Sequence, residues 1–140
     1  IFSDWHPEIQ HILENTKPDN LYKWGLHDRL PMNKWSKGRF SLLGDAAHPM
    51  LPFVAQGAAM AIEDGIVLAS SLSSFDNVAL GLNDYENKRK YRTAKAQKTA
   101  TRNATIFHLS DFFAIFRNLV MKFFIKKIMD SFYKYDAVSK

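Results

Sequence analysis

Cysteine is absent from the 140 residues, and this absence excludes disulfides, thiolate metal ligands and cysteine nucleophiles together. The sequence is therefore compatible with a reducing cytoplasm, which is the location we expect. No uncharged apolar run of about 18 residues occurs, so no membrane span is predicted. The first residues have neither the basic and apolar regions of a signal peptide nor an initiator methionine. We therefore expect the chain to be a fragment of a longer protein.

The composition is that of a chain able to bury a core, with 46% hydrophobic and 24% charged residues. The net charge of +5 would suit nucleic acid, an anionic membrane or an anionic cofactor, and it does not choose among them. The basic run from Lys88 to Arg102 contains one aromatic residue, Tyr91, so it lacks the stacking platforms of a single-strand binder. We expect a solvated helix face and no nucleic-acid partner.

The first third of the chain predicts one helix and two strands. Apolar spacing over residues 5–16 indicates a helix. Residues 21–30 mix aromatic and polar side chains and predict a strand. A turn at 35–39 leads into a short apolar strand at 40–43, of the kind that is buried in a layered sheet.

The rest of the chain predicts helices. Glycine and proline break the pattern between 44 and 55, and small residues then predict a helix over 56–72. After a loop at 73–81, Asn83 or Asp84 could cap a long helix that continues to about residue 104. The last third places apolar residues at spacings of three and four, on one face: Phe112, Phe113, Phe116, Leu119, Val120, Phe123 and Phe124. We expect the core or another subunit to cover this face, and we favour membrane contact less.

The segment from Gly38 to Gly65 carries the chemistry. Asp45 directly follows the strand that ends at Gly44, at the edge where layered α/β proteins bind ligands. After an irregular loop, a helix begins at Gly57 with small residues, which let a ligand approach its unpaired N–H groups. Such amides suit a ligand that carries or develops negative charge, and Asp45 can accept hydrogen bonds from hydroxyl groups. A sugar-like chain joined to an electron-accepting ring would use both parts.

One string in this segment is distinctive. It reads Gly44-Asp45-Ala46-Ala47-His48-Pro49, then Pro52, then Ala55-Gln56-Gly57-Ala58, then Glu63-Asp64. The string resembles the second flavin signature of the aromatic-ring hydroxylase family, the single-component FAD monooxygenases. It is most similar to their salicylate hydroxylase and 6-hydroxynicotinate monooxygenase branch. Residues 21–30 resemble the strand that returns from the substrate domain of that family.

The resemblance implies an α/β fold class: the C-terminal portion of a Rossmann-like, glutathione-reductase-type FAD-binding fold, mostly helical after a short strand pair. Residues 1–35 would be the end of the substrate domain and the returning strand. Residues 36–80 would be the C-terminal part of the FAD-binding domain, and 81–140 the C-terminal helices. The Gly-x-Gly-x-x-Gly motif of the family and most of its substrate domain are not in this chain. The implied partner is therefore the N-terminal part of the same protein, and a homo-oligomer is compatible with the sequence.

The resemblance also implies site roles. Asp45 would bind the ribityl hydroxyls of FAD, and the backbone of Gly57, Ala58 and Ala59 would face the pyrimidine end of the isoalloxazine. Pro52 would line the ring without offering an N–H. The expected cofactor-binding set is completed by two further residues, Gly44 and Gln56. We predict no catalytic side chain and no metal ligand in this chain.

The implied reaction hydroxylates a small aromatic or heteroaromatic substrate with NADH or NADPH as reductant. Two alternatives stay open: a flavoprotein of the same fold with other chemistry, such as an epoxidase or halogenase, or a non-enzymatic helical module that binds a membrane or partner. His48 is predicted to be structural, and Arg89 could reach back toward the flavin domain. Phe53 stands where the branch usually has histidine, which leaves the substrate open.

Overall fold

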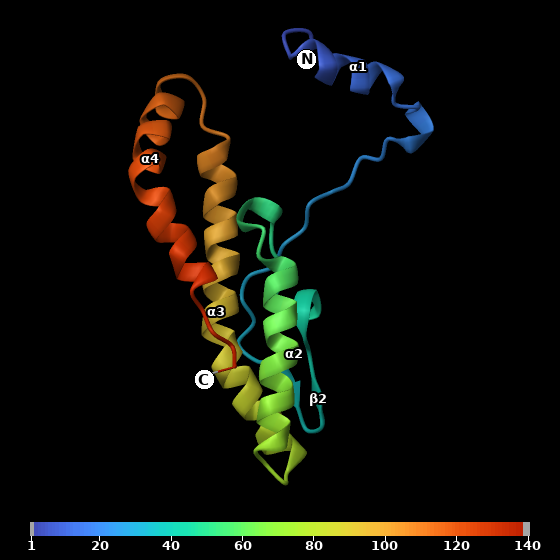
Figure 1. Cartoon of the computed structure of the whole chain (residues 1–140). Coiled ribbons are helices and arrows are strands. Elements are labelled where there is room, and N and C mark those ends of the chain that lie inside the picture. The colour runs from blue at the N-terminus through green and yellow to red at the C-terminus, as the bar shows by residue number, and fades with distance from the viewer. Residues whose placement is uncertain (1, 139–140) are drawn as a thin grey trace.

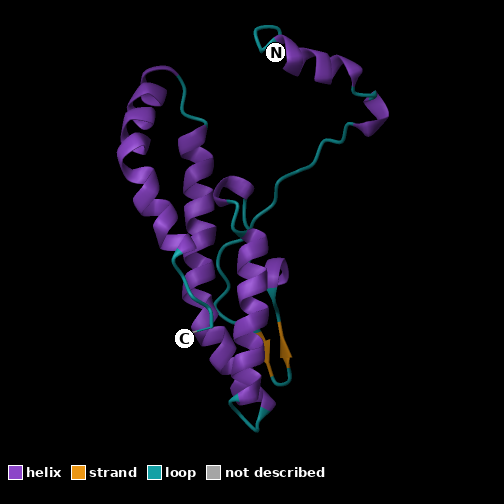
Figure 2. Ribbon diagram, viewed as in Figure 1, coloured by secondary structure: helices purple, strands orange, loops and turns teal. Residues whose placement is uncertain are grey.

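Four helices and one short hairpin are formed by the described residues (Figure 1), and helix predominates among them (Figure 2). The computed structural model describes residues 2–138. The regular elements are α1 (Pro7–Asn15), β1 (Ser36–Lys37), β2 (Phe40–Ser41), α2 (Gly57–Ser73), α3 (Val78–Phe107) and α4 (Asp111–Tyr133). Three single turns of 3-10 helix join them: η1 (Pro18–Asn20), η2 (Gly44–Ala46) and η3 (Pro52–Val54). The predicted fold class, mostly helical after a short strand pair, is confirmed.

Helices α2 and α3 run side by side and form the centre of the molecule (Figure 1). The loop between them is short because Asn77 caps α3, its side chain accepting the N–H of Ala79 at 2.9 Å. The predicted cap at Asn83 or Asp84 is therefore wrong, since both residues lie inside the helix. Close packing is possible at this end because Gly81 faces the α2 backbone: a Cβ there would lie 3.2 Å from the Leu72 Cα.

The core consists of two small clusters on α3. One joins residues of the η3 loop, α2, α3 and the end of α4: Val54, Met60, Ala96, Ala100 and Phe132. The other joins residues before and after the hairpin to α2 and α3: Trp35, Ala47, Val67 and Tyr85. The clusters hold η3 against α3 and η2 against α2. The loop that was predicted to carry chemistry is thus fixed between the two central helices.

The hairpin is shorter and more exposed than predicted. Strand β1 pairs antiparallel with β2 through Ser36 opposite Ser41 and Lys37 opposite Phe40. The expectation of a buried strand at 40–43 is wrong, since Phe40 is 82% exposed. Among the described residues β2 has only β1 as a neighbour, so it has no sheet in which to be buried.

The strand predicted at 21–30 is not formed. A strand requires a hydrogen-bonded neighbour, and no strand of the described chain pairs with this segment. Its Leu21, Trp24 and Leu30 side chains are 63, 81 and 86% exposed. Figure 1 shows this segment leading away from α2 and α3 to α1, which has no buried residue. Its inner end is anchored to α3, where Gln97 Nε2 donates to the Arg29 carbonyl at 3.0 Å.

Helix α4 returns beside α3 and is mostly exposed (Figure 1). The expectation that the core covers its phenylalanines is wrong: Phe112, Phe116 and Phe123 are 74, 62 and 70% exposed. Among the α4 side chains that the structure describes, only Phe132, near the C-terminal end, joins the core. The spacing was read correctly, but α3 meets α4 along another side. Coverage by a second subunit stays a prediction. Within residues 2–138, no helix is both long and apolar enough to cross a membrane.

Candidate functional site

A cleft of about 510 Å³ opens between η2, η3 and the N-terminus of α2. Four of the residues predicted from the sequence line it together: Asp45, Pro52, Gly57 and Ala58. Asp45 and the mouth of the helix therefore face one space, as the sequence pattern predicted. The predicted position of Asp45 at the end of a strand is wrong, because β2 ends at Ser41 and Asp45 lies in η2. Whether these residues bind a cofactor is a separate matter, which stays a prediction.

The other three predicted residues do not line the cleft. Gly44 is buried, and its N–H donates to the Asp64 carboxylate at 3.1 Å. Gln56 is 4% exposed and precedes α2, where its carbonyl accepts the Met60 N–H at 2.8 Å. Ala59 lies in the first turn of α2, outside the lining. These residues shape the cleft from behind.

Sequence reasoning missed four lining residues, Met50, Leu51, Ala55 and Ala61. Ala61 could have been found, because it lies four positions after Gly57 and so shares its helix face. The other three belong to an irregular loop, where no period indicates which side chains face the cleft.

The N-terminus of α2 offers free amides to this cleft. The first bond of the helix runs from Met60 N–H to Gln56, so the amides of Gly57, Ala58 and Ala59 have no intrahelical acceptor. Gln56 provides no side-chain cap. The partial positive charge of the helix end therefore points to the space that Asp45 borders.

Two left-handed backbone residues set the direction of the chain on either side of the cleft. Gly44 has φ +59°, and a Cβ there would lie 3.3 Å from the Cβ of Ala61. Only glycine adopts this turn without strain, and the turn brings Asp45 to the cleft. Ala55 is also left-handed, with φ 52° and ψ 34°, at a cost of about 1–2 kcal/mol for a residue with a Cβ. This strained residue turns the chain into α2.

A buried carboxylate, Asp64, ties these parts together. Its oxygens accept the Gly44 N–H at 3.1 Å and the Arg89 Nε–H at 2.7 Å, and His48 Nε2 lies 2.6 Å away. Burial raises the pKa of Asp64, but hydrogen bonds from His48 and Arg89 outweigh burial and hold this pKa below its usual value. The ionised Asp64 side chain on α2 thus joins the turn at Gly44, the loop at His48 and helix α3 at Arg89.

Arg89 extends this network and is itself fully buried. It donates to Glu63 at 2.7 Å and to the Met60 carbonyl at 3.2 Å, and Arg92 donates to the same Glu63 at 2.6 Å. Burial lowers the pKa of Arg89, but the hydrogen bonds to Asp64 and Glu63 have the larger, opposite effect. The pKa of Arg89 therefore lies above its usual value. The reach predicted for Arg89 is confirmed, since its side chain contacts Asp64 and Met60 of the 38–65 segment. His48 is buried against Asp64, and its structural role stays a prediction.

Stability should fall in acid because of Asp64 and Glu86. Glu86 accepts the N–H groups of Trp35 and Ser36 at 3.0 and 2.8 Å. Burial raises the pKa of Glu86, but these bonds lower it more. Both folded pKa values lie below the ordinary 3.8 and 4.5, so the unfolded state binds more protons in this range. The stabilisation is therefore complete above about pH 4.5 and is lost as pH falls through the depressed values.

Urea denaturation between pH 6 and pH 3 measures this loss. We expect the free energy of unfolding to decrease below pH 4.5, and to decrease less steeply in Glu86→Gln. An unchanged slope in that variant would show that Glu86 does not contribute.

The fold and the cleft suggest a class of protein: the C-terminal portion of an α/β domain of the FAD-binding type, with an acid and a helix N-terminus lining one cleft. The family described as "FAD binding domain" matches residues 1–100. The chain belongs to this family. The alternative of a helical module without a cofactor is therefore disfavoured.

Particular relatives narrow the comparison. The chain is 46% identical over 104 residues to 6-hydroxynicotinate 3-monooxygenase of Pseudomonas fluorescens, covering 73% of the chain and 26% of that protein. It is 34% identical over 134 residues to 3-hydroxybenzoate 6-hydroxylase of Klebsiella oxytoca, covering 95% of the chain and 32% of that protein.

A solved structure agrees with these relatives. Klebsiella pneumoniae HpxO complexed with FAD and uric acid matches with a TM-score of 0.79 and 26% identity, over 93% of the chain and 34% of HpxO. The chain thus spans about a quarter to a third of the length of the proteins it matches.

Proposed function

We propose that this chain is the C-terminal part of an FAD-dependent monooxygenase that hydroxylates an aromatic or heteroaromatic ring with NADH or NADPH and dioxygen. The observation that carries the proposal is the cleft shared by Asp45 and the free amides of Gly57 and Ala58, in a chain of the FAD-binding family. Relatives named for hydroxylating 6-hydroxynicotinate and 3-hydroxybenzoate support the reaction class over epoxidation or halogenation.

The residues present fit the ribityl and isoalloxazine half of FAD. Asp45 is exposed in the cleft and can accept hydrogen bonds from ribityl hydroxyls. The amides of Gly57 and Ala58 are available to the pyrimidine end of the ring, and Met50 and Leu51 offer apolar wall. When bound, FAD would supply the chemistry: it takes a hydride from the reduced nicotinamide and activates dioxygen for transfer to the substrate.

The protein's own contribution is orientation and electrostatics. Asp45 would hold the ribityl chain of FAD, and the preorganised amides of Gly57 and Ala58 would favour a ring that carries negative charge. Pro52 lines the cleft and has no N–H, so it would border the ring without donating a hydrogen bond there. Asp64 and Arg89 do not line the cleft. They hold α2 against α3 and fix the turn at Gly44, and so fix the positions of the residues that do line it.

The division of the chain follows from the same proposal. Residues 1–35 end the substrate domain, 36–80 complete the FAD-binding domain, and 81–140 form the C-terminal helices. The exposed apolar side chains of residues 21–30 support a partner segment in the N-terminal part of the same protein. The small aromatic substrate, a cytoplasmic location and a homo-oligomer stay predictions.

Gly57→Ala tests the site without disturbing the fold. A Cβ at Gly57 meets no protein atom within 4 Å, so the free energy of unfolding should not fall. The added methyl group projects at the mouth of α2 and should crowd the ring, weakening FAD binding about tenfold, which corresponds to about 1.4 kcal/mol. Titration of the full-length apoprotein with FAD, followed by flavin fluorescence, measures this change.

Gly65→Ala is the matched control, since a Cβ there also meets no atom within 4 Å and Gly65 does not line the cleft. Its FAD affinity should equal that of the wild type. Equal affinities for all three proteins would contradict the site, and a full-length protein that cannot be loaded with FAD would contradict the function. The reaction itself is tested by NADH consumption with small hydroxylated benzoates and pyridines, together with detection of the hydroxylated product.

A further inference from the structure

The outer face of α4 carries a stripe of large apolar side chains that the described residues leave open. Phe112, Phe116, Leu119 and Phe123 are spaced by four, three and four residues and so lie along one line of the helix. They are 74, 62, 57 and 70% exposed. We call these four residues the outer stripe. An exposed aromatic patch of this kind marks an interaction surface.

The opposite side of α4 already faces protein. Met121, Ile125 and Met129, also spaced by four, line a cavity of about 350 Å³ together with the η3 loop and α3. Arg117 donates to the Phe107 carbonyl at 2.9 Å and joins α4 to the end of α3. Helix α4 therefore contacts the rest of the described chain through one side, and the outer stripe lies on the opposite, exposed side.

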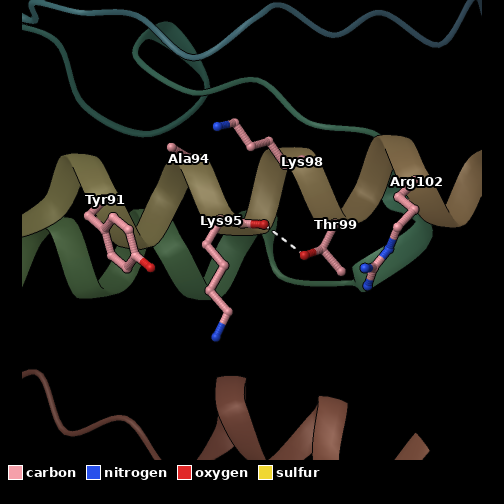
Figure 3. Close-up of a pocket in the computed structure, with 6 residues that line it drawn as sticks. All are labelled: Tyr91, Ala94, Lys95, Lys98, Thr99 and Arg102. Atoms are coloured by element: carbon pink, nitrogen blue, oxygen red, sulfur yellow. Dashed lines mark hydrogen bonds between the residues drawn. The ribbon is translucent and has the colours of Figure 1, made fainter. Parts of the chain in front are cut away.

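The surroundings of the outer stripe are strongly cationic. Residues 93–130 contain seven lysines and arginines and two carboxylates, Asp111 and Asp130. Lys122 and Lys126 are exposed on α4 itself. Helix α3 adds a hollow of about 320 Å³ whose lining includes Lys95, Lys98 and Arg102. Figure 3 shows Lys95 and Arg102 extending from the same side of the helix as Tyr91. Lys95 Nζ lies 5.5 Å from the centre of the Phe132 ring, so this hollow adjoins the end of α4.

Charge decides which partner suits this surface. A second copy of the same face would bring lysines against lysines, with two carboxylates on α4, Asp111 and Asp130, to pair them, which is unfavourable. An anionic lipid surface satisfies both features, since acyl chains accept the phenylalanines and phosphate groups pair with the cations. We propose that α4 lies in the surface of an anionic membrane, with the outer stripe among the acyl chains and Lys122 and Lys126 at the headgroups. This inference does not rest on the proposed reaction.

Co-sedimentation of the full-length protein with lipid vesicles tests the proposal. We expect at least tenfold tighter binding to vesicles of phosphatidylglycerol and phosphatidylcholine than to phosphatidylcholine alone, and weaker binding as salt is raised. Phe116→Ser with Phe123→Ser should reduce binding at least tenfold, and Lys122→Glu with Lys126→Glu should do the same.

The controls are matched exposed residues elsewhere. Phe75→Ser lies in the loop between α2 and α3, and Lys37→Glu lies on β1; neither should alter vesicle binding. Circular dichroism of each variant reports whether it is folded. The proposal is overturned by equal binding to neutral and anionic vesicles, or by no binding to either. It is also overturned if the phenylalanine pair converts a dimer to a monomer and leaves vesicle binding unchanged.

Discussion

Arg89→Met should lower the free energy of unfolding by about 3–5 kcal/mol, the cost of leaving a buried charge without its partner. The Arg89 and Asp64 side chains are both 0% exposed, and Arg89 also pairs with Glu63. Methionine would fill part of the space but would leave the Asp64 carboxylate with fewer hydrogen bonds in a buried site. Urea denaturation of the full-length protein, followed by circular dichroism, measures the change.

Lys90→Met is the matched control, because Lys90 is the next residue and its side chain is 39% exposed. Its ion pair with Glu86 is 3.8 Å long, and we expect a change within about 1 kcal/mol. The double variant Asp64→Asn with Arg89→Met should be more stable than the sum of the two single losses predicts, because the two residues interact. Equal losses for Arg89→Met and Lys90→Met would contradict the network.

Asp45→Ala should weaken FAD binding by about 10- to 100-fold, since a hydrogen bond to a charged group contributes about 1.5–3 kcal/mol. The fold should be unaffected: Asp45 is exposed, and no hydrogen bond of its side chain is found within residues 2–138. The variant thus separates binding from stability. Titration with FAD and urea denaturation of the same preparation measure the two effects.

Asp76→Ala controls for loss of an exposed carboxylate, since Asp76 lies in the loop at the other end of α2. It should bind FAD with wild-type affinity. Asp45→Asn, which keeps one oxygen acceptor, should fall between wild type and Asp45→Ala. If Asp45→Ala retains full affinity, the ribityl chain is held elsewhere.

The cleft could be predicted from the sequence because its signals are local. A glycine at a tight turn, an acid after it, prolines that exclude regular structure and a small-residue helix start all lie within residues 44–59. Each acts on its own few neighbours, so none depends on the rest of the fold. Local errors were the end of the strand, which is Ser41 and not Gly44, and the cap of α3, which is Asn77 and not Asn83 or Asp84.

The predictions that were wrong concern burial and strand pairing, which depend on residues far apart in the sequence. Residues 21–30 have strand-like composition, but a strand also requires a neighbour, and composition does not supply one. The period of α4 was read correctly, yet period does not reveal which side is covered. Likewise Asp64 and Arg89 lie 25 residues apart, and their contact depends on the register between α2 and α3.

A crystal structure of the full-length protein with FAD tests the central claim most directly. We predict one FAD molecule whose ribityl hydroxyls contact the Asp45 carboxylate while its pyrimidine end faces the amides of Gly57 and Ala58. An FAD bound away from this cleft, or an Asp45 side chain turned from the start of α2 in the complex, would contradict the account.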